Sequence, residues 1–135
     1  MQLQVIAHAR NGFSQKFGIP RQSGIVPELR GRIVFDPPYR NMDALRGLDG
    51  FDYIWILWEF SANKSQEERR ASSWQPTVRP PLLGGNTQMG VFATRSPYRP
   101  NPIGLSSVQI ESIELSTTEG PVIHVLGADL MDGTP

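Results

Sequence analysis

The segment from Phe51 to Phe60 (FDYIWILWEF) constrains the fold more than any other part of the sequence. Its odd and even positions are both largely apolar, which predicts a strand covered on both faces. The core can cover one face, and a helix or a second subunit must cover the other. A chain of 135 residues has few elements to spare for that purpose, so we expect a homo-oligomer. Glu59 is the one charge late in this strand, and an exposed strand end explains it better than a site carboxylate.

Shorter apolar runs between turn-forming residues predict the rest of the fold. Further strands are expected at Leu3–Ala9, Arg30–Phe35, Gln88–Ala93, Ile103–Leu115 and Pro121–Leu126. In the longest of these the apolar residues change phase after Leu105 and again after Ile110, which predicts two bulges that bend the sheet toward closure. The last strand is its natural hairpin partner. The pattern favours a mainly β fold, a small single-domain antiparallel β-barrel with one or two short helices.

The remaining segments are turn-rich or polar. A short helix is expected from Met42 to Arg46, with Asn41 as its cap and Gly47 ending it. The stretch from Asn11 to Val26 is loop-like, and Ala62 to Ser73 is either a solvated helix or a loop to which we assign no chemistry.

Composition excludes several classes of protein. Hydrophobic content of 39% and charged content of 19% indicate a globular chain. No apolar run reaches the roughly 18 residues of a membrane span, and the amino terminus lacks a signal-peptide core, so we expect a cytoplasmic protein. The absence of cysteine removes disulfides and thiolate zinc sites. His8 and His124 lie in predicted strands without further ligand partners, so no metal site is expected.

The familiar nucleotide-binding and hydrolase motifs are also missing. The sequence has no Gly-x-Gly-x-x-Gly after a strand, no Gly-x-x-x-x-Gly-Lys and no Gly-x-Ser-x-Gly. A Rossmann cofactor site, a P-loop and a hydrolase nucleophile elbow are therefore not predicted.

The zero net charge of the chain hides an asymmetry along it. The part from residue 69 to 110 has five arginines and no acid, and the part from residue 111 onward has five acids and no lysine or arginine. The guanidinium group offers a planar fork of donors for a carboxylate, a phosphate or a base edge. Two interpretations stay open at this point: an anion-contacting surface, or two blocks that neutralise each other.

Four segments concentrate arginine, proline, glycine or acidic turn residues. They are PRQSG (20–24), WQPTVRPPLLGG (74–85), ATRSPYRPNPIG (93–104) and DLMDGTP (129–135). Arg79 and Arg99 each precede a proline, which biases them toward extended backbone and holds them on a stiff chain. Stiff loops with forked cations can grip an anion at low entropic cost. Alternatively, these are structural turns whose arginines only pair with carboxylates.

The run GVFATRSPYRPNPIGLS (90–106) gives the chain a resemblance to a known family. Together with PTVRPPLLGGN upstream, PRQSG, DLMDGTP and LRGLDGFDYIWIL (45–57), it resembles the TsaA-like, or YaeB-like, family over nearly the whole chain. The resemblance implies a β-barrel that dimerises and binds S-adenosylmethionine near the subunit interface. It also implies methylation of N6 of threonylcarbamoyladenosine, beside the anticodon of tRNA.

Carried over by position, the resemblance implies a set of cofactor contacts. They are Pro20, Arg21, Gln22, Ser61, Ala62, Arg95, Leu105, Asp129, Leu130, Met131 and Asp132. Arg21 or Arg95 could hold the cofactor carboxylate as a bidentate fork. Asp129 or Asp132 could accept a hydrogen bond from the ribose or the ammonium group. Relatives often have a His-Gln type of pair at positions 61 and 62, so this chain departs from the family there.

The RNA side of the site is inferred from charge and stiffness. Arg79 and Arg99 are expected to contact phosphate or base. No catalytic residue is assigned: Glu59 is a weak candidate for a general base, and water can take the proton once the methyl group has moved.

Three alternatives remain at the level of sequence. A non-catalytic module that binds S-adenosylmethionine or RNA competes with the methyltransferase, as does a methyltransferase acting on another small substrate.

Relatives typically continue past the DGTP end (132–135), so residues 1–135 are expected to form one barrel domain that is either a short member or truncated at its carboxy terminus.

Overall fold

The computed structural model describes residues 1–11, 30–60, 74–130 and 132–135. Its strands are β1 (Ala7–Arg10), β2 (Arg30–Phe35), β3 (Tyr53–Glu59), β4 (Thr77–Val78), β5 (Met89–Gly90), β6 (Ile103–Glu114) and β7 (Val122–Leu126). The helices of the described residues are short 3-10 turns: η1 (Pro37–Tyr39), η2 (Met42–Leu45), η3 (Leu48–Gly50), η4 (Pro81–Leu83) and η5 (Val91–Ala93). The chain is therefore mainly β, as the sequence predicted.

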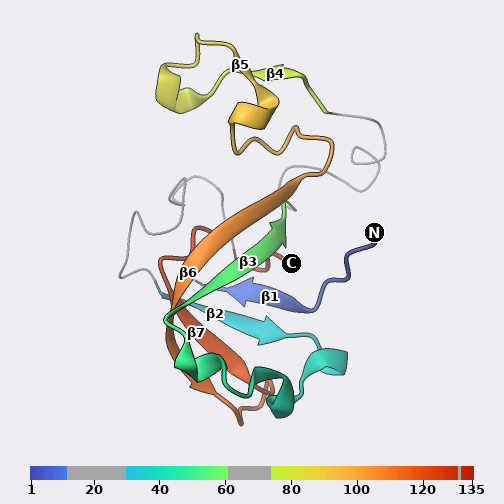
Figure 1. The fold of residues 1–135 in the computed structure, drawn as a ribbon, viewed down its shortest axis with the longest axis vertical. Helices are drawn as coiled ribbons and strands as arrows, with labels where there is room; N and C mark the ends of the chain where they lie inside the picture. The colour runs from blue at the N-terminus through green and yellow to red at the C-terminus, as the bar shows by residue number, and fades with distance from the viewer. Residues whose placement is uncertain (12–29, 61–73, 131) are drawn as a thin grey trace. The chain divides into compact units, whose positions relative to one another are not determined.

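Five strands form one curled sheet in the order β1-β2-β7-β6-β3 (Figure 1). The pairs β1–β2, β2–β7 and β6–β7 are antiparallel, and β6 is long and visibly curved. A register shift between Ile110 and Ser112 lies at the second of the two predicted bulges. The expected closed barrel is corrected to a half-barrel, because β1 and β3 stand at opposite ends of the order of the described strands.

The chain divides into two compact units. The first, residues 1–58 and 105–135, contains the curled sheet except for the ends of β3 and β6. The second, residues 59–104, contains the β4–β5 hairpin with its two 3-10 turns. No helix among the described residues is long and apolar enough to cross a membrane.

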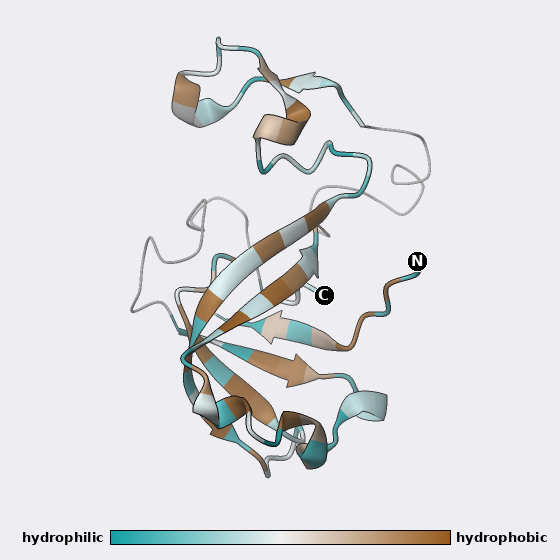
Figure 2. Ribbon diagram, viewed as in Figure 1, coloured by the Kyte–Doolittle hydropathy of each residue, from teal (hydrophilic) through white to brown (hydrophobic). Residues whose placement is uncertain are grey.

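The core of the first unit lies on one face of the sheet. Alternation along the strands places Ala9, Ile33 and Ile123 on this face, and Val125 is fully buried. Leu45 of η2 and Leu48 of η3 pack against the same cluster, so the turns between β2 and β3 cover part of it. Figure 2 shows the resulting alternation of apolar and polar bands along the strands.

Several elements differ from their predicted bounds. The first strand begins at Ala7 rather than Leu3, and Leu3 is exposed. The predicted strand Gln88–Ala93 is corrected to a two-residue strand followed by η5, because the backbone turns after Gly90 and Thr94 N donates to Val91 O. The helix predicted at Met42–Arg46 is a 3-10 turn ending at Leu45, and Asn41 caps it as expected by accepting from Asp43 N.

One glycine in the β6–β7 turn is required by both its backbone and its surroundings. Gly120 has φ +76, and an added Cβ would lie 2.9–3.0 Å from the side chain of Arg40. We expect Gly120→Ala to lower the free energy of unfolding by about 1–2 kcal/mol, because a left-handed conformation strains any residue with a Cβ. Urea unfolding measures the change. Gly50→Ala is the matched control, since its Cβ would meet nothing within 4 Å; equal losses in both variants would contradict the prediction.

Candidate functional site

A buried polar chain joins three elements of the first unit. The indole Nε1–H of Trp58 in β3 donates to Ser106 Oγ at 3.0 Å, and the hydroxyl of Ser106 in β6 donates to Asp129 Oδ1 at 2.9 Å. Ser106 and Asp129 are both buried, at 1% and 7% exposure. A carboxylate taken from water is tolerated only when hydrogen bonds compensate its desolvation, so this chain fixes where Asp129 lies.

The segment that carries Asp129 is also tied to the edge strand β1. Ala9 N donates to Thr134 O at 2.8 Å, and Gly133 N donates to Ala9 O at 2.7 Å. Asp132 Oδ1 accepts from Asn11 N at 2.9 Å, and the Asn11 side-chain amide donates to Leu130 O at 2.6 Å. The turn predicted to contact the cofactor is thus fastened at both ends, with the Leu130 side chain packed in the core.

The other face of β3 is apolar and exposed. Tyr53, Trp55 and Leu57 are 60%, 73% and 62% exposed. The hydrogen bond from Trp58 to Ser106 puts both of these residues on the inner face, so their neighbours Leu57 and Leu105 share the outer one. Leu105 is 52% exposed. Two adjacent strands therefore present one apolar surface, here called the β3–β6 outer face: Tyr53, Trp55, Leu57 and Leu105.

Three of the four arginines assigned to the cofactor or to RNA, Arg79, Arg95 and Arg99, lie in the second unit, and they differ in what holds them. Arg99 donates from Nε to Ser96 O at 3.0 Å and from an Nη to Ile103 O at 2.6 Å. Its guanidinium also lies 5.9 Å from the centroid of the Phe60 ring. Arg99 thus stabilises its own loop. This role is close to the alternative that the arginines of these turns are structural, although its partners are backbone carbonyls rather than carboxylates. Arg79 and Arg95 are exposed.

A polar cleft of about 380 Å³ lies on the face of the sheet opposite the core. The register aligns Arg10, Arg32, His124 and Ser112 across four strands along it. Contacts within the cleft already engage several of its polar groups: His124 Nε2 and Glu114 Oε1 lie 2.6 Å apart, and Arg30 forms an ion pair with Glu111 at 3.3 Å. No predicted cofactor residue lines it, so the cleft does not define the candidate site.

The structure brings only part of the predicted cofactor set together. Asp129, Leu130 and Asp132 share one anchored turn, and Leu105 neighbours Ser106, which binds that turn. The side chain of Leu105 points to the opposite face from Ser106. Six of the predicted contacts lie outside the described residues: Pro20, Arg21, Gln22, Ser61, Ala62 and Met131.

Sequence reasoning missed Trp58 and Ser106 as partners of Asp129. Both residues alternate with the exposed positions of their strands, and this alternation was the available signal. A serine at an inward position of a strand needs a polar partner, but only the folded sheet identifies which one.

The described residues define a mainly β protein built on a curled, antiparallel half-barrel sheet, unlike a Rossmann domain. Residues 8–135 match the family model described as the tRNA-methyltransferase O N-terminal domain. The chain belongs to this family.

Individual relatives agree with that assignment. The chain is 45% identical to the tRNA (adenine(37)-N6)-methyltransferase of Escherichia coli, over 99% of this chain and 54% of the relative. It is 40% identical to a Pseudomonas aeruginosa protein named "Putative S-adenosylmethionine-dependent methyltransferase RcsF", over 96% of this chain and 52% of the relative. A crystal structure of TrmO superimposes with a TM-score of 0.72 at 34% identity, covering 100% of this chain and 54% of that one. The chain thus spans about half the length of these relatives.

The buried hydrogen bonds of Ser106 generate a stability prediction. Ser106→Ala leaves the Trp58 N–H and a buried oxygen of Asp129 without their shared partner, so we expect a loss of about 1–3 kcal/mol in the free energy of unfolding. Urea unfolding followed by circular dichroism measures it. Ser107→Ala, one residue along the same strand and less buried, should change stability by no more than about 0.5 kcal/mol. A similar loss in both variants would show that the hydrogen-bonded chain contributes little.

Proposed function

We propose that the protein is an S-adenosylmethionine-dependent methyltransferase acting on N6 of threonylcarbamoyladenosine next to the anticodon of tRNA. Family membership and 45% identity to a tRNA (adenine(37)-N6)-methyltransferase over nearly the whole chain carry this proposal. The anchored turn that holds Asp129 supplies the structural support, since it is fixed before any ligand binds.

The residues present fit the cofactor in kind. S-adenosylmethionine has an adenine, a ribose, an ammonium and a carboxylate, and it supplies an electrophilic methyl group from its sulfonium. Asp129 and Asp132 offer carboxylate acceptors for the ammonium or ribose, and Arg95 offers donors for the carboxylate. Leu105 offers an exposed apolar surface for the adenine. These roles are part of the proposal. It also includes cofactor contacts from the remaining residues of the set: Pro20, Arg21, Gln22, Ser61, Ala62, Leu130 and Met131.

The protein's contribution to rate is alignment. Methyl transfer is an in-line displacement, so holding the adenosine amine opposite the bond that breaks supplies much of the acceleration. The amine loses a proton after the methyl group has moved, and solvent can accept it. A base in an anticodon loop is already single-stranded, so placing it in a site costs little unstacking energy.

We further propose that the working form is a homodimer with the cofactor site near its interface. The β3–β6 outer face is an apolar surface of the kind that soluble proteins cover. Leu105, a proposed cofactor contact, belongs to this face. A second copy seated there would therefore cover the apolar residues and border the site at once.

The methyl-transfer proposal is tested with labelled cofactor. We expect the protein, incubated with methyl-labelled S-adenosylmethionine and tRNA from a strain lacking the enzyme, to place label on the adenosine beside the anticodon. Nuclease digestion and chromatography locate the label. Tight cofactor binding without labelled tRNA would favour a non-catalytic binding module instead, and label on another small molecule would favour a different substrate.

The dimer proposal is tested at Trp55, the most exposed of the four residues of the β3–β6 outer face. Trp55→Arg puts a charge on the β3–β6 outer face, so we expect a monomeric mass in light scattering at micromolar concentration and at least tenfold weaker cofactor binding by calorimetry. Met42→Arg makes the same change at an exposed apolar residue of η2 and should keep the dimeric mass and the affinity. A monomeric mass for the unsubstituted protein would exclude an interface site.

A further inference from the structure

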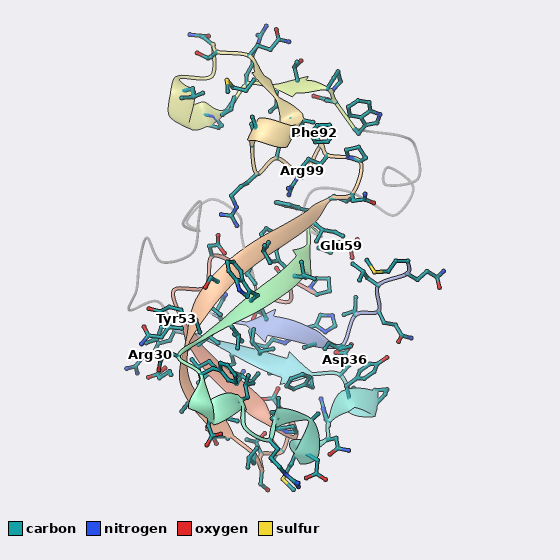
Figure 3. The ribbon with its side chains drawn as sticks, in the orientation of Figure 1. Arg30, Asp36, Tyr53, Glu59, Phe92 and Arg99 are labelled. Atoms are coloured by element: carbon teal, nitrogen blue, oxygen red, sulfur yellow. The ribbon has the colours of Figure 1, made fainter. Side chains whose placement is uncertain are left out.

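An aromatic pair lies exposed on the second unit. The rings of Trp74 and Phe92 stack with centroids 6.5 Å apart and planes 7° from parallel. Their exposed fractions are 45% and 77%. Two large apolar rings usually gain stability by burial, and here a large part of their surface stays available to a partner. Figure 3 labels Phe92 on η5 of this unit.

The backbone under the two rings is held by hydrogen bonds within the unit. Val91 N donates to Pro76 O, and Gln75 N donates to Tyr98 O, both at 2.9 Å. Trp74 thus precedes one strand of the β4–β5 hairpin, and Phe92 follows the other. Val91, next to Phe92, is buried at 1% exposure and anchors the turn. The rings are therefore positioned in advance, which lowers the entropic cost of binding a flat ligand.

The charge around the pair indicates the class of partner. From Trp74 to Gly104 the sequence has three arginines (Arg79, Arg95 and Arg99) and no acidic residue. Arg79 is exposed and directly follows β4, at the loop end of the hairpin whose open end the two rings flank. A basic surface with exposed aromatic rings suits a polyanion that also has flat faces, and single-stranded nucleic acid combines the two.

We propose that Trp74 and Phe92 form a stacking platform for an unpaired base of the RNA substrate, with Arg79 facing its phosphates. The inference rests on the proposed tRNA substrate and deepens it by naming a contact outside the cofactor set. An unpaired base is favoured over a duplex, because paired bases are stacked on each other and offer no free face to a ring. The platform is a positioning element: it would hold a loop nucleotide while another base receives the methyl group.

The test measures binding of a fluorescent RNA hairpin with the anticodon stem and loop of a tRNA, by anisotropy. We expect Trp74→Ala to weaken binding on the order of tenfold, and Phe92→Ala to act in the same direction. Trp74→Phe should recover much of the loss, because it restores a ring. Leu83→Ala, an exposed apolar change in the same unit, is the matched control and should keep the original affinity. Calorimetry should show unchanged cofactor affinity in all four variants.

A double-mutant cycle identifies the base. An abasic site is placed at one loop position at a time, and the affinity of each hairpin for the unsubstituted protein and for Trp74→Ala is measured. At the position that stacks on the platform, removing the base should cause no further loss of affinity in Trp74→Ala. Additive losses at every position, an intact affinity in Trp74→Ala, or no measurable hairpin binding by the unsubstituted protein would each contradict the platform. So would a change of oligomeric mass in Trp74→Ala, which would assign the rings to a contact between copies.

The outcomes separate this inference from the proposed function. Coupling between Trp74 and one loop base, without methyl transfer to tRNA, would support the stacking platform and contradict the proposed methyltransferase activity. Methyl transfer with an unchanged KM for tRNA in both Trp74→Ala and Phe92→Ala would support the methyltransferase activity and contradict the stacking platform. If both hold, Trp74→Ala should raise KM for tRNA with little change in kcat.

Discussion

The structure depends on the way strand alternation separates two chemistries on β3 and β6. Trp58 and Ser106 face inward and hold Asp129, whereas Leu57 and Leu105 face outward and form an apolar surface. Successive side chains of a strand point to opposite faces, so the inward polar pair and the outward apolar pair depend on the same strand register. A shift of that register by one residue would exchange the two faces. The hydrogen bonds from Trp58 to Ser106 and from Ser106 to Asp129 resist such a shift, since the carboxylate would lose its partner.

This separation gives each part of the candidate site a distinct physical role. The inner side fixes the Asp129 turn, which two backbone hydrogen bonds with Ala9 also fasten to β1. The outer side exposes the apolar residues of the β3–β6 outer face. Within the second unit, Trp74 and Phe92 are exposed on a backbone held by hydrogen bonds. Hydrogen bonds thus hold the Asp129 turn and the aromatic pair in place, each within its own unit.

The arginine-rich run shows where chemistry inferred from composition needs the folded chain. Arg79 and Arg99 look equivalent in sequence, since each precedes a proline. In the structure Arg99 donates to two backbone carbonyls of its own loop, whereas Arg79 is exposed. Local sequence determines the stiffness of both turns, but only the path of the loop decides which guanidinium is used to hold it.

The sequence by itself indicated the five strands of the curled sheet, the bulge near Ile110 in β6 and the turn capped by Asn41, because periodicity and turn chemistry are local. It also indicated that β3 has two apolar faces. Only the tertiary structure decided that the sheet curls into a half-barrel, that Ser106 links Trp58 to Asp129, and that Trp74 stacks on Phe92. These features join residues far apart in the sequence, and such pairings follow from how the strands and turns pack rather than from the pattern of any one segment.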